Sequence, residues 1–314
     1  MLSDVWFGIN ESGISRDFET MRRLCLAAED SGFDFFSIPD HFMDTGTGLG
    51  PPLECWTSLS GLAAVTNEIK LAPLVSCYAF REPTVLGRMA TTIDIISGGR
   101  LIFGIGAGWH EHEFMGYMGR FPPASERLMG LEETVIVCKK MFKEESISHS
   151  GVLYQYENVL NSPPPVQKHV PILIGGGGER TTLKIAAKYA DISHFHPWFG
   201  IDVVERKVKA LKEHCKTVGR DYDEIRKGIG FALFLGRDRE EIMAKVQKIR
   251  DAEGSRVEST KPGTEMIKLG TPDVIAEQLR NYIGMGFGCI TLTFPPSNSP
   301  EDMNLFYEKV VPLL

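Results

Sequence analysis

Asp40 and His41 stand side by side just after a short apolar segment, residues 33–38, which Pro39 ends. The segment has the composition of a buried strand, so we expect the pair in the loop beyond it. Histidine titrates near neutral pH, and His41 could therefore be the base that hydride transfer from an alcohol-like substrate requires. The alternative is a loop histidine that only hydrogen-bonds the backbone.

A second candidate site follows the apolar segment 100–105, which breaks into Gly106, Ala107 and Gly108. No bulky side chain intervenes there, so the backbone can approach a flat ligand closely, and we expect these residues to bind a cofactor. Trp109 follows at once and could stack on a ring or form a substrate wall. The alternative, a core tryptophan, fits less well directly after a glycine break.

Four consecutive glycines, Gly175, Gly176, Gly177 and Gly178, lie between a predicted strand and a predicted helix. Their exposed N–H groups at a helix N-terminus favour an anion, and a cofactor phosphate is the natural guest. The spacing is not that of a dinucleotide-binding motif. The alternative is a flexible connection without a ligand.

Two histidine pairs, His194 with His196 and His110 with His112, have a spacing that metal sites use. Residues i and i+2 of a strand share a face, so the first pair could chelate an ion. Metal-dependent barrel hydrolases add carboxylate ligands at other strand ends, and no such aspartate follows the last predicted strand. We therefore predict no metal and expect His196 and Trp198 to line the mouth of the pocket.

Apolar runs alternate with helical patterns along most of the chain. The predicted strands span residues 5–10, 33–38, 69–77, 100–105, 171–174, 191–195, 227–235 and 288–294. Each is nearly continuously apolar, as in a parallel sheet covered on both faces, and eight such strands can close a barrel. We predict an α/β fold, a (β/α)8 TIM barrel that forms a single domain over residues 1–314.

Two segments interrupt the alternation. Residues 111–121 read as an irregular insertion after the fourth strand, and residues 144–160 read as a β-hairpin excursion before the fifth. A polar stretch, residues 254–261, is expected to be mobile. Helices are predicted in between, among them 83–96, which carries more apolar positions than one inward stripe needs.

Composition limits the classes of function. The 314 residues are 43% hydrophobic, enough for one large core, and the net charge of −7 argues against a general nucleic-acid binder. No basic run predicts a membrane surface, no apolar run would span a bilayer, and the first residues do not read as a signal peptide. The six cysteines are scattered singly, which predicts a reduced, cytoplasmic protein.

Three blocks of the sequence carry a family resemblance: residues 97–109, residues 164–168 with 171–180, and residues 39–42. Together they resemble the bacterial luciferase-like monooxygenase superfamily, and within it they are most similar to oxidoreductases that use the deazaflavin coenzyme F420. The resemblance covers nearly the whole chain. It implies a small-molecule substrate and a homodimer that packs through helices near the early strands.

The resemblance also implies roles for particular residues. Asp40 would contact the cofactor, and His41 would lie close to the reacting ring carbon. Ser76 and Cys77 would form a bulge with a non-prolyl cis peptide behind the ring, although an ordinary strand end is the open alternative. Trp109 replaces the glutamate that sugar-phosphate dehydrogenases of the family place there, which argues against glucose 6-phosphate and simple alcohol oxidation.

We count Glu111 with His41 and Trp109 as the candidate catalytic residues. Glu113 lies nearby as well, and a shift of two residues from the family position changes the geometry.

The sequence thus predicts an oxidoreductase that transfers a hydride between coenzyme F420 and a small organic substrate. One alternative is an FMN-dependent monooxygenase of the same superfamily, which would use reduced flavin and oxygen. Two others belong to different classes, a non-catalytic flavin-binding protein and a metal-dependent hydrolase.

Overall fold

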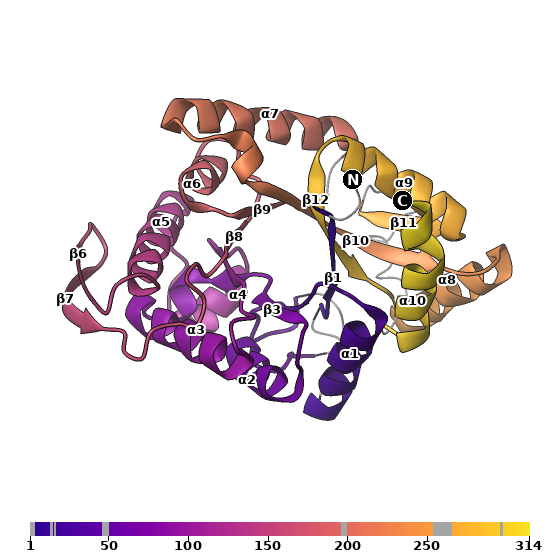
Figure 1. Ribbon diagram of the computed structural model, residues 1–314, viewed down its shortest axis with the longest axis horizontal. Helices are drawn as coiled ribbons and strands as arrows, with labels where there is room; N and C mark the ends of the chain where they lie inside the picture. The colour runs from indigo at the N-terminus through magenta and orange to yellow at the C-terminus, as the bar shows by residue number, and fades with distance from the viewer. Residues whose placement is uncertain are drawn as a thin grey trace.

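A parallel sheet rolled into a barrel forms the centre of the molecule. The computed structural model describes residues 4–12, 15, 17–45, 50–195, 200–253, 266–295 and 298–314. In Figure 1 the strands form a ring and the helices lie outside it. The predicted α/β barrel is confirmed.

Eight strand positions make up the ring. They are β1 (Trp6–Asn10), β2 (Phe35–Ile38), β3 (Lys70–Pro73) continued by β4 (Ser76–Cys77), β5 (Phe103–Gly106), β8 (Ile172–Gly175), β9 (Ile192–Phe195), β10 (Arg226–Leu235) and β12 (Phe287–Thr293). Neighbouring strands pair in the order β3-β2-β1-β12-β10-β9-β8-β5-β4, and all of these pairs between ring neighbours are parallel. A bridge between Leu71 and Leu101 joins the two ends.

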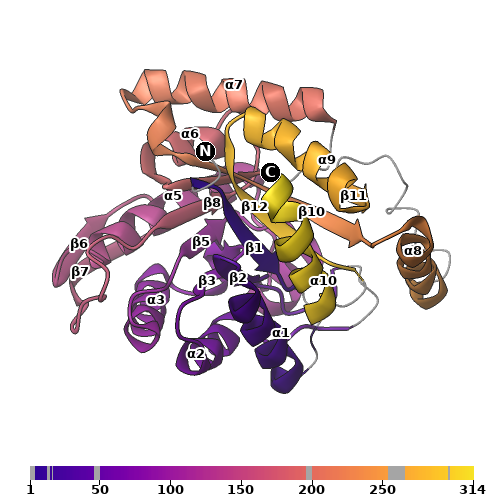
Figure 2. The same cartoon turned by 45° about the vertical axis from the view of Figure 1, so that its right-hand side comes forward.

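Helices cover the outside of the ring because their apolar faces need the outer side chains of the strands. They are α1 (Phe18–Ser31), α2 (Cys55–Val65), α3 (Pro83–Ser97), α5 (Ala124–Met141), α6 (Thr182–Tyr189), α7 (Ile201–Val218), α9 (Pro272–Gly284) and α10 (Pro300–Leu305). The helix α8 (Arg239–Glu253) stands apart, at the far end of β10, as Figure 2 shows.

The inside of the barrel is filled by a separate apolar cluster. Its members come from six different strands or strand ends and are almost fully buried: Phe35, Ala72, Ile102, Leu173, Ile192 and Cys289. Side chains alternate along each strand, so the outward residues join the larger core under the helices. The barrel is therefore a packed core below its mouth, not a pore.

The third strand differs from its prediction. It is divided into β3 and β4 by Leu74 and Val75, which are joined by a non-prolyl cis peptide bond. The family resemblance predicts such a bond at Ser76 and Cys77, with an ordinary strand end as the alternative; the bond lies two residues earlier. The apolar run 69–77 looks uninterrupted, and therefore its pattern gave no sign of the break.

The insertion after β5 lies where it was predicted, but it is helical, not irregular. It contains the single turn α4 (Glu111–Glu113) and a π-helical segment, Phe114–Met118. Phe114 anchors it, because this ring is 1% exposed and lies 5.6 Å from the Phe80 ring and 5.2 Å from the Phe121 ring. The turn positions Glu113 above the barrel.

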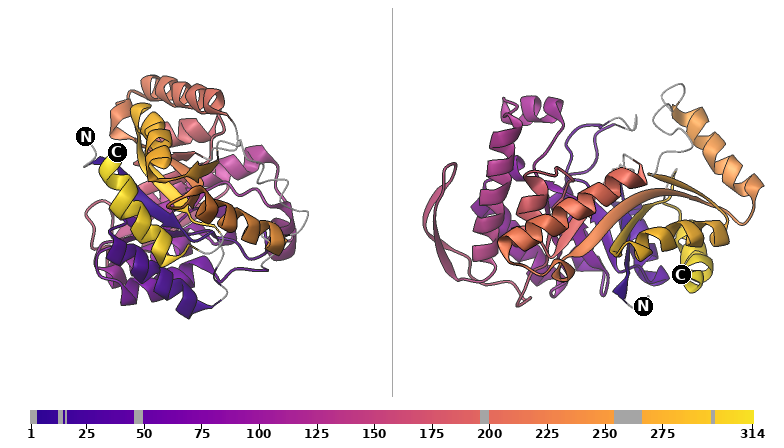
Figure 3. Two further views of the ribbon diagram at one scale, coloured as in Figure 1. Left: turned by 90° about the vertical axis from the view of Figure 1, so that its right-hand side faces the viewer. Right: turned by 90° about the horizontal axis from the view of Figure 1, so that it is seen from above.

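The predicted hairpin is confirmed as β6 (Ser146–Ser150) and β7 (Gln155–Leu160). Glu133 of α5 holds its turn by accepting N–H donors from Val152, Leu153 and Tyr154. At the opposite end of the molecule, the long β10 extends outward and pairs with β11 (Ile267–Gly270), a strand that was not predicted. Figure 3 shows the hairpin and α8 at these two extremes.

The base of the barrel is tied together by charged side chains that bind backbone groups. Arg100 donates to the carbonyl oxygens of Ala63, Thr66 and Ile69 at 2.7–2.9 Å. Glu29 accepts three consecutive N–H groups, from residues 67–69, and Asp94 accepts those of residues 166 and 167. These contacts fix the loops that lead into β3 and β8.

One face of α3 carries apolar side chains that the chain itself does not cover. Val85 is 53% exposed and Ile96 is 44% exposed, while Met89 between them is half-buried. Positions 85, 89 and 96 lie on one stripe of the helix, beside the face that carries the buried Leu86 and Ile93. We propose that this stripe joins two copies of the chain in a homodimer.

Light scattering at micromolar concentration should then give twice the monomer mass. Val85→Lys combined with Ile96→Lys should give the monomer, because two charges would be buried without partners. Val152→Lys, on the exposed hairpin, is the control and should leave the dimer intact. A wild-type protein that scatters as a monomer contradicts the proposal.

Candidate active site

Asp40 is a buried charge at the mouth of the barrel, just past the end of β2. It is 2% exposed, and Arg81 binds it through two nitrogens, at 2.6 Å and 3.0 Å. Arg81 also pairs with Glu54, the N-cap residue of α2. Burial lowers the pKa of Arg81, but the two carboxylates outweigh this and leave the pKa above its ordinary value. The group is therefore an ionised triad.

Ser76 and Cys77 belong to the same network. The Ser76 hydroxyl donates to Asp40 at 2.8 Å and accepts the indole N–H of Trp56 at 3.0 Å. The N–H of Cys77 donates to Asp40 at 3.3 Å, and burial raises the pKa of its thiol to about 12. Protein groups thus bind both Asp40 oxygens and the Ser76 hydroxyl, and the cofactor-binding role of these residues stays a prediction.

Two of the predicted cofactor glycines make room for the segment between β3 and β4. A Cβ atom at Gly106 would lie 2.7 Å from Cγ2 of Val75, and one at Gly175 would lie 2.7 Å from Cγ1 of the same side chain. Val75 therefore occupies the space between the ends of β5 and β8. Gly108 has φ +68 and faces Cys77 and Phe114. Packing thus accounts for these glycines without a ligand.

His41 is held by a carboxylate from the insertion. Its Nδ1 lies 2.8 Å from Oε2 of Glu113, whose other oxygen accepts the N–H groups of Phe42 and Met43 at 2.7 Å and 3.0 Å. The side chain of Glu113 is 1% exposed, and that of His41 is 21% exposed. One end of the imidazole is therefore fixed inside the protein.

The ionisation of Glu113 decides which His41 nitrogen carries a proton. Burial raises the pKa of Glu113, but the hydrogen bonds from His41 and from the backbone of Met43 and Phe42 outweigh it, so the pKa lies below its ordinary value of 4.5. An ionised carboxylate only accepts hydrogen bonds. Nδ1 of His41 must then be the donor, which leaves Nε2 of the neutral ring as a proton acceptor.

Aromatic rings surround this pair. The Trp109 ring is 61% exposed and meets His41 edge-on at 5.9 Å between centroids. Nδ1 of His110 lies 3.5 Å from Oε2 of Glu113, which is too far for a good hydrogen bond. This buried nitrogen has no hydrogen-bond partner among the described residues. Glu111 is exposed. Of the two nearby carboxylates, the structure brings Glu113 to His41, and Glu111 as a catalytic residue stays a prediction.

Glu113 is the residue that sequence reasoning passed over. The segment was expected to be an irregular loop, in which no rule separates Glu111 from Glu113. In a helical turn, residues two apart point about 200° apart around the axis, so one carboxylate faces the barrel and the other faces water. The sequence signal that could have identified Glu113 is the aromatic Phe114 directly after it, because a large apolar side chain in a polar segment indicates that the segment is anchored. In the structure Phe114 is 1% exposed.

The glycine run joins β8 to α6 and has a cation beside it. Gly176 takes φ +123, and a Cβ atom at Gly177 would lie 3.1 Å from Nζ of Lys207. Lys207 is on α7, its side chain is 15% exposed, and its ammonium binds the carbonyl oxygen of Gly177. A glycine loop with an adjacent lysine suits an anion. Lys207 comes from another element and was not predicted.

A hollow of about 210 Å³ opens beside His41. Its lining comes from the ends of β1 and β2 and from the loop after β2: Ser12, Pro39, His41, Met43, Asp44, Thr45, Gly50 and Pro52. None of these residues is a lysine or arginine. The hollow therefore offers one imidazole and mostly uncharged walls.

The histidine pairs do not assemble a metal site in the part of the chain that the structure describes. No three His, Cys, Asp or Glu side chains there could hold an ion together. His194 is buried inside the barrel with Nε2 2.8 Å from the Thr291 hydroxyl. His196 and Trp198 lie outside the described residues.

No described helix is both long and apolar enough to cross a membrane.

Comparison with known proteins identifies the class to which this barrel and mouth belong. The luciferase-like monooxygenase family matches residues 5–288, and the chain belongs to this family. One relative is the F420-dependent glucose-6-phosphate dehydrogenase of Mycobacterium leprae, 26% identical over 93% of this chain and 92% of the relative.

The names of other similar proteins include both F420 and FMN. The FMNH(2)-dependent dimethylsulfone monooxygenase of Pseudomonas putida is 23% identical over 97% of this chain and 90% of its own length. The structure of an F420-dependent secondary alcohol dehydrogenase has a TM-score of 0.83, with 15% identity and 98% of both chains covered. The last likeness shows the fold. Relatives of this chain thus use F420 or FMN.

Replacing Glu113 by Gln should reveal its charge through stability. The pKa of Glu113 is lower in the folded protein than its ordinary 4.5, so its ionised form stabilises the fold above about pH 4.5 and loses this effect as the pH falls through the folded value. We expect Glu113→Gln to cost about 1–3 kcal/mol at pH 7 and less at pH 3 in urea unfolding.

Glu111→Gln is the matched control, because Glu111 is exposed two residues away. Its effect should stay within about 0.5 kcal/mol at both pH values. An equal loss for both variants, or a loss for Glu113→Gln that does not shrink in acid, contradicts the assignment.

Proposed function

We propose that the protein is an oxidoreductase that transfers a hydride between coenzyme F420 and a small organic substrate, with His41 exchanging the accompanying proton. The observation that carries this proposal is the hydrogen bond of 2.8 Å between His41 and the buried Glu113, beside an open hollow. A positioned imidazole near neutral pH is what proton exchange with an alcohol or a carbonyl requires.

Each residue of the pair has a separate task. Glu113 holds the ring by Nδ1 and stabilises the imidazolium that forms when Nε2 takes a proton, as a carboxylate does for the histidine of a hydrolase triad. His41 can then return the proton in the reverse direction. Bound F420 would supply the hydride acceptor or donor, while the protein supplies the base and the orientation.

The residues at the mouth fit a flat cofactor with a phosphate. The N–H groups of Gly177 and Gly178 and the ammonium of Lys207 would hold the anion, while Gly176, whose own N–H donates to the carbonyl oxygen of His194 at 3.0 Å, would shape the loop. Val75 would lie behind the ring, between Gly106 and Gly175. Ala107, Gly108 and the network of Asp40, Ser76 and Cys77 would support that wall.

The substrate we propose is uncharged and not a sugar phosphate. Trp109 offers an exposed aromatic face next to His41, and the hollow there is lined by no lysine or arginine. Arg81 is nearby, but Asp40 and Glu54 already bind it. A phosphate group would therefore meet no free cation beside His41 among the described residues.

An FMN-dependent monooxygenase is the second candidate. The dimethylsulfone monooxygenase supports it, because this relative matches 97% of the chain. The glycine run and Lys207 would serve the FMN phosphate equally well. The two candidates differ in the reaction that follows, since reduced flavin reacts with oxygen and reduced deazaflavin transfers a hydride.

Titration of the purified protein with F420 and with FMN, followed by absorbance and fluorescence, tests the proposal. F420 should bind at least tenfold more tightly than FMN. Anaerobic mixing of the reduced F420 complex with a panel of neutral compounds that can accept a hydride should restore the F420 absorbance. Tighter binding of FMN, with oxygen consumption by the reduced complex, favours the monooxygenase instead.

We further propose that the protein works in the reducing cytoplasm as a homodimer that binds small molecules. All six cysteines are free and buried, so the fold uses none of them in a disulfide. The net charge of −7 gives no support to a nucleic-acid partner.

Gly177→Asp should weaken F420 binding about tenfold or more, because it places a carboxylate beside the expected phosphate and against Lys207. Lys207→Met should also weaken it by removing the cation. Lys209→Met is the matched control, since Lys209 is an exposed lysine of the same helix, and should not change affinity. Unchanged titration by both test variants contradicts the phosphate assignment.

His41→Ala should lower turnover by about 10²–10⁴-fold while F420 affinity changes little, as for loss of a general acid or base. His41→Asn should be nearly as slow, because an amide can still donate to Glu113 but has no group that exchanges a proton at the position of Nε2. If Asn restores most activity, His41 is a scaffold residue and the proton follows another route.

A further inference from the structure

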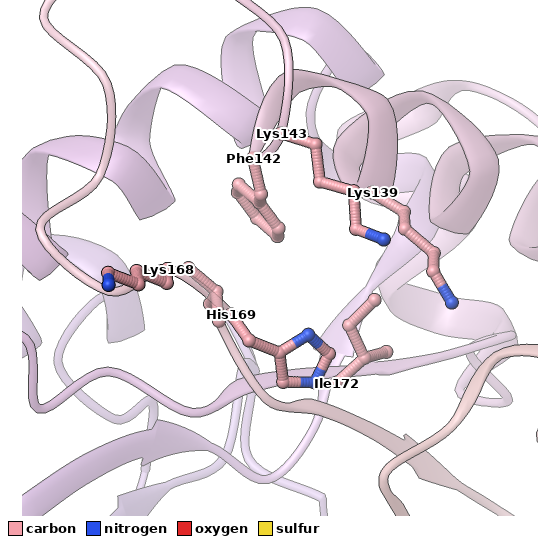
Figure 4. Close-up of a pocket in the computed structure, with 7 residues that line it drawn as sticks. Lys139, Phe142, Lys143, Lys168, His169 and Ile172 are labelled. Atoms are coloured by element: carbon pink, nitrogen blue, oxygen red, sulfur yellow. The ribbon is translucent and has the colours of Figure 1, made fainter.

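A second hollow lies at the other end of the barrel, away from the mouth. Its volume is about 220 Å³, and it is formed where α5 ends and the chain enters β8. Figure 4 shows the residues that line it: Lys139, Phe142, Lys143, Lys168, His169, Val170 and Ile172. Ile172 is the first residue of β8 and Gly175 the last, so the hollow and the glycine run lie at opposite ends of one short strand.

Cationic side chains from two elements face this hollow. Lys139 and Lys143 are four residues apart at the end of α5, and Figure 4 shows their ammonium groups opposite the ring of His169. Lys168 extends away from them. Within the described residues, neither Lys139 nor Lys143 has a carboxylate within 4.0 Å, whereas Lys188 on the neighbouring α6 binds Glu132 at 2.6 Å.

His169 is held in place from behind. Its Nε2 lies 2.8 Å from Oδ1 of Asp191, whose other oxygen accepts the N–H of Ile172 at 2.8 Å. The carboxylate fixes the orientation of the ring. A ring nitrogen turns toward the lysines in Figure 4. The other ring nitrogen of His169 therefore points into the hollow.

The arrangement costs free energy when nothing binds there. Lys143 follows the end of α5 by two residues, and its charge repels that of Lys139. Burial lowers the pKa of Lys139, Asp191 raises it, and Lys143 and Arg220 lower it further. The end of α5 favours lysines through its dipole, but this does not explain why a braced histidine from another segment faces them. An oxyanion would offset all of these charges at once.

The chemistry of the walls limits which ligands the hollow could bind. The buried Phe142 and Val170 line one side, and the cationic side chains line the other. We propose that it binds a small oxyanion between Lys139, Lys143 and His169, either inorganic phosphate or the phosphate or carboxylate group of a small metabolite. This site is independent of the proposed F420 reaction.

Protection of lysines from acetylation by a water-soluble acetyl ester, read by mass spectrometry, locates the anion. Inorganic phosphate should slow the labelling of Lys139 and Lys143 at least fivefold relative to chloride at equal ionic strength. Lys184, exposed on α6, is the internal control and should label at the same rate in both salts. Equal labelling of Lys139 and Lys143 in phosphate and chloride overturns the proposal, because it leaves charge screening only.

Calorimetric titration separates this hollow from the glycine run, which would also take phosphate. In the Gly177→Asp background, Lys139→Met with Lys143→Met should weaken phosphate binding at least tenfold, and Lys184→Met should not. Acetate in place of phosphate distinguishes a carboxylate site from a phosphate site. Phosphate affinity that survives the double substitution contradicts the proposal, whatever the outcome of the F420 titration.

Discussion

The mouth of the barrel depends on the neutralisation of one buried charge. Asp40 sits at the end of β2 with almost no exposure, and a carboxylate there is tolerable only because Arg81 binds it with two nitrogens. Breaking such a pair by removing one partner typically costs about 3–5 kcal/mol. Through Ser76 and Glu54 the pair also fixes β4 and the start of α2, so three segments take their positions from it.

The two adjacent residues Asp40 and His41 have different tasks: Asp40 supports the loop, and His41 is placed for proton transfer. Asp40 and His41 are adjacent in sequence, yet Asp40 turns inward to Arg81 while His41 reaches Glu113 of the insertion. The ion pair under Asp40 makes the loop rigid, and the second carboxylate orients a side chain on that loop. A base placed in this way needs little reorganisation when a proton moves. Val75 and the glycine run lie at strand ends, and Lys207 reaches the glycine run from α7.

The sequence predicts the barrel well because each strand is a nearly continuous apolar run, and such runs need burial on both faces. It fails where the decisive contact is distant in the chain. Lys207 reaches the glycine run from the next helix but one, and Glu113 depends on a helical turn that polar residues disguise. The short β11 has too few apolar residues to stand out and forms only because β10 extends beyond the ring to pair with it.

The ties at the base of the barrel have a consequence for how such a protein can change over generations. Arg100, Glu29 and Asp94 secure the loops that enter the strands by gripping main-chain groups, which every amino acid provides. Loop sequences there can drift without loosening the frame, as long as the three gripping side chains remain. Apart from the segments that Asp40 and Glu113 bind, the loops at the mouth face no such demand and can be lengthened, shortened or exchanged. Related proteins can therefore acquire new substrates through changes in the mouth loops, while the contacts at the base of the barrel keep the fold stable.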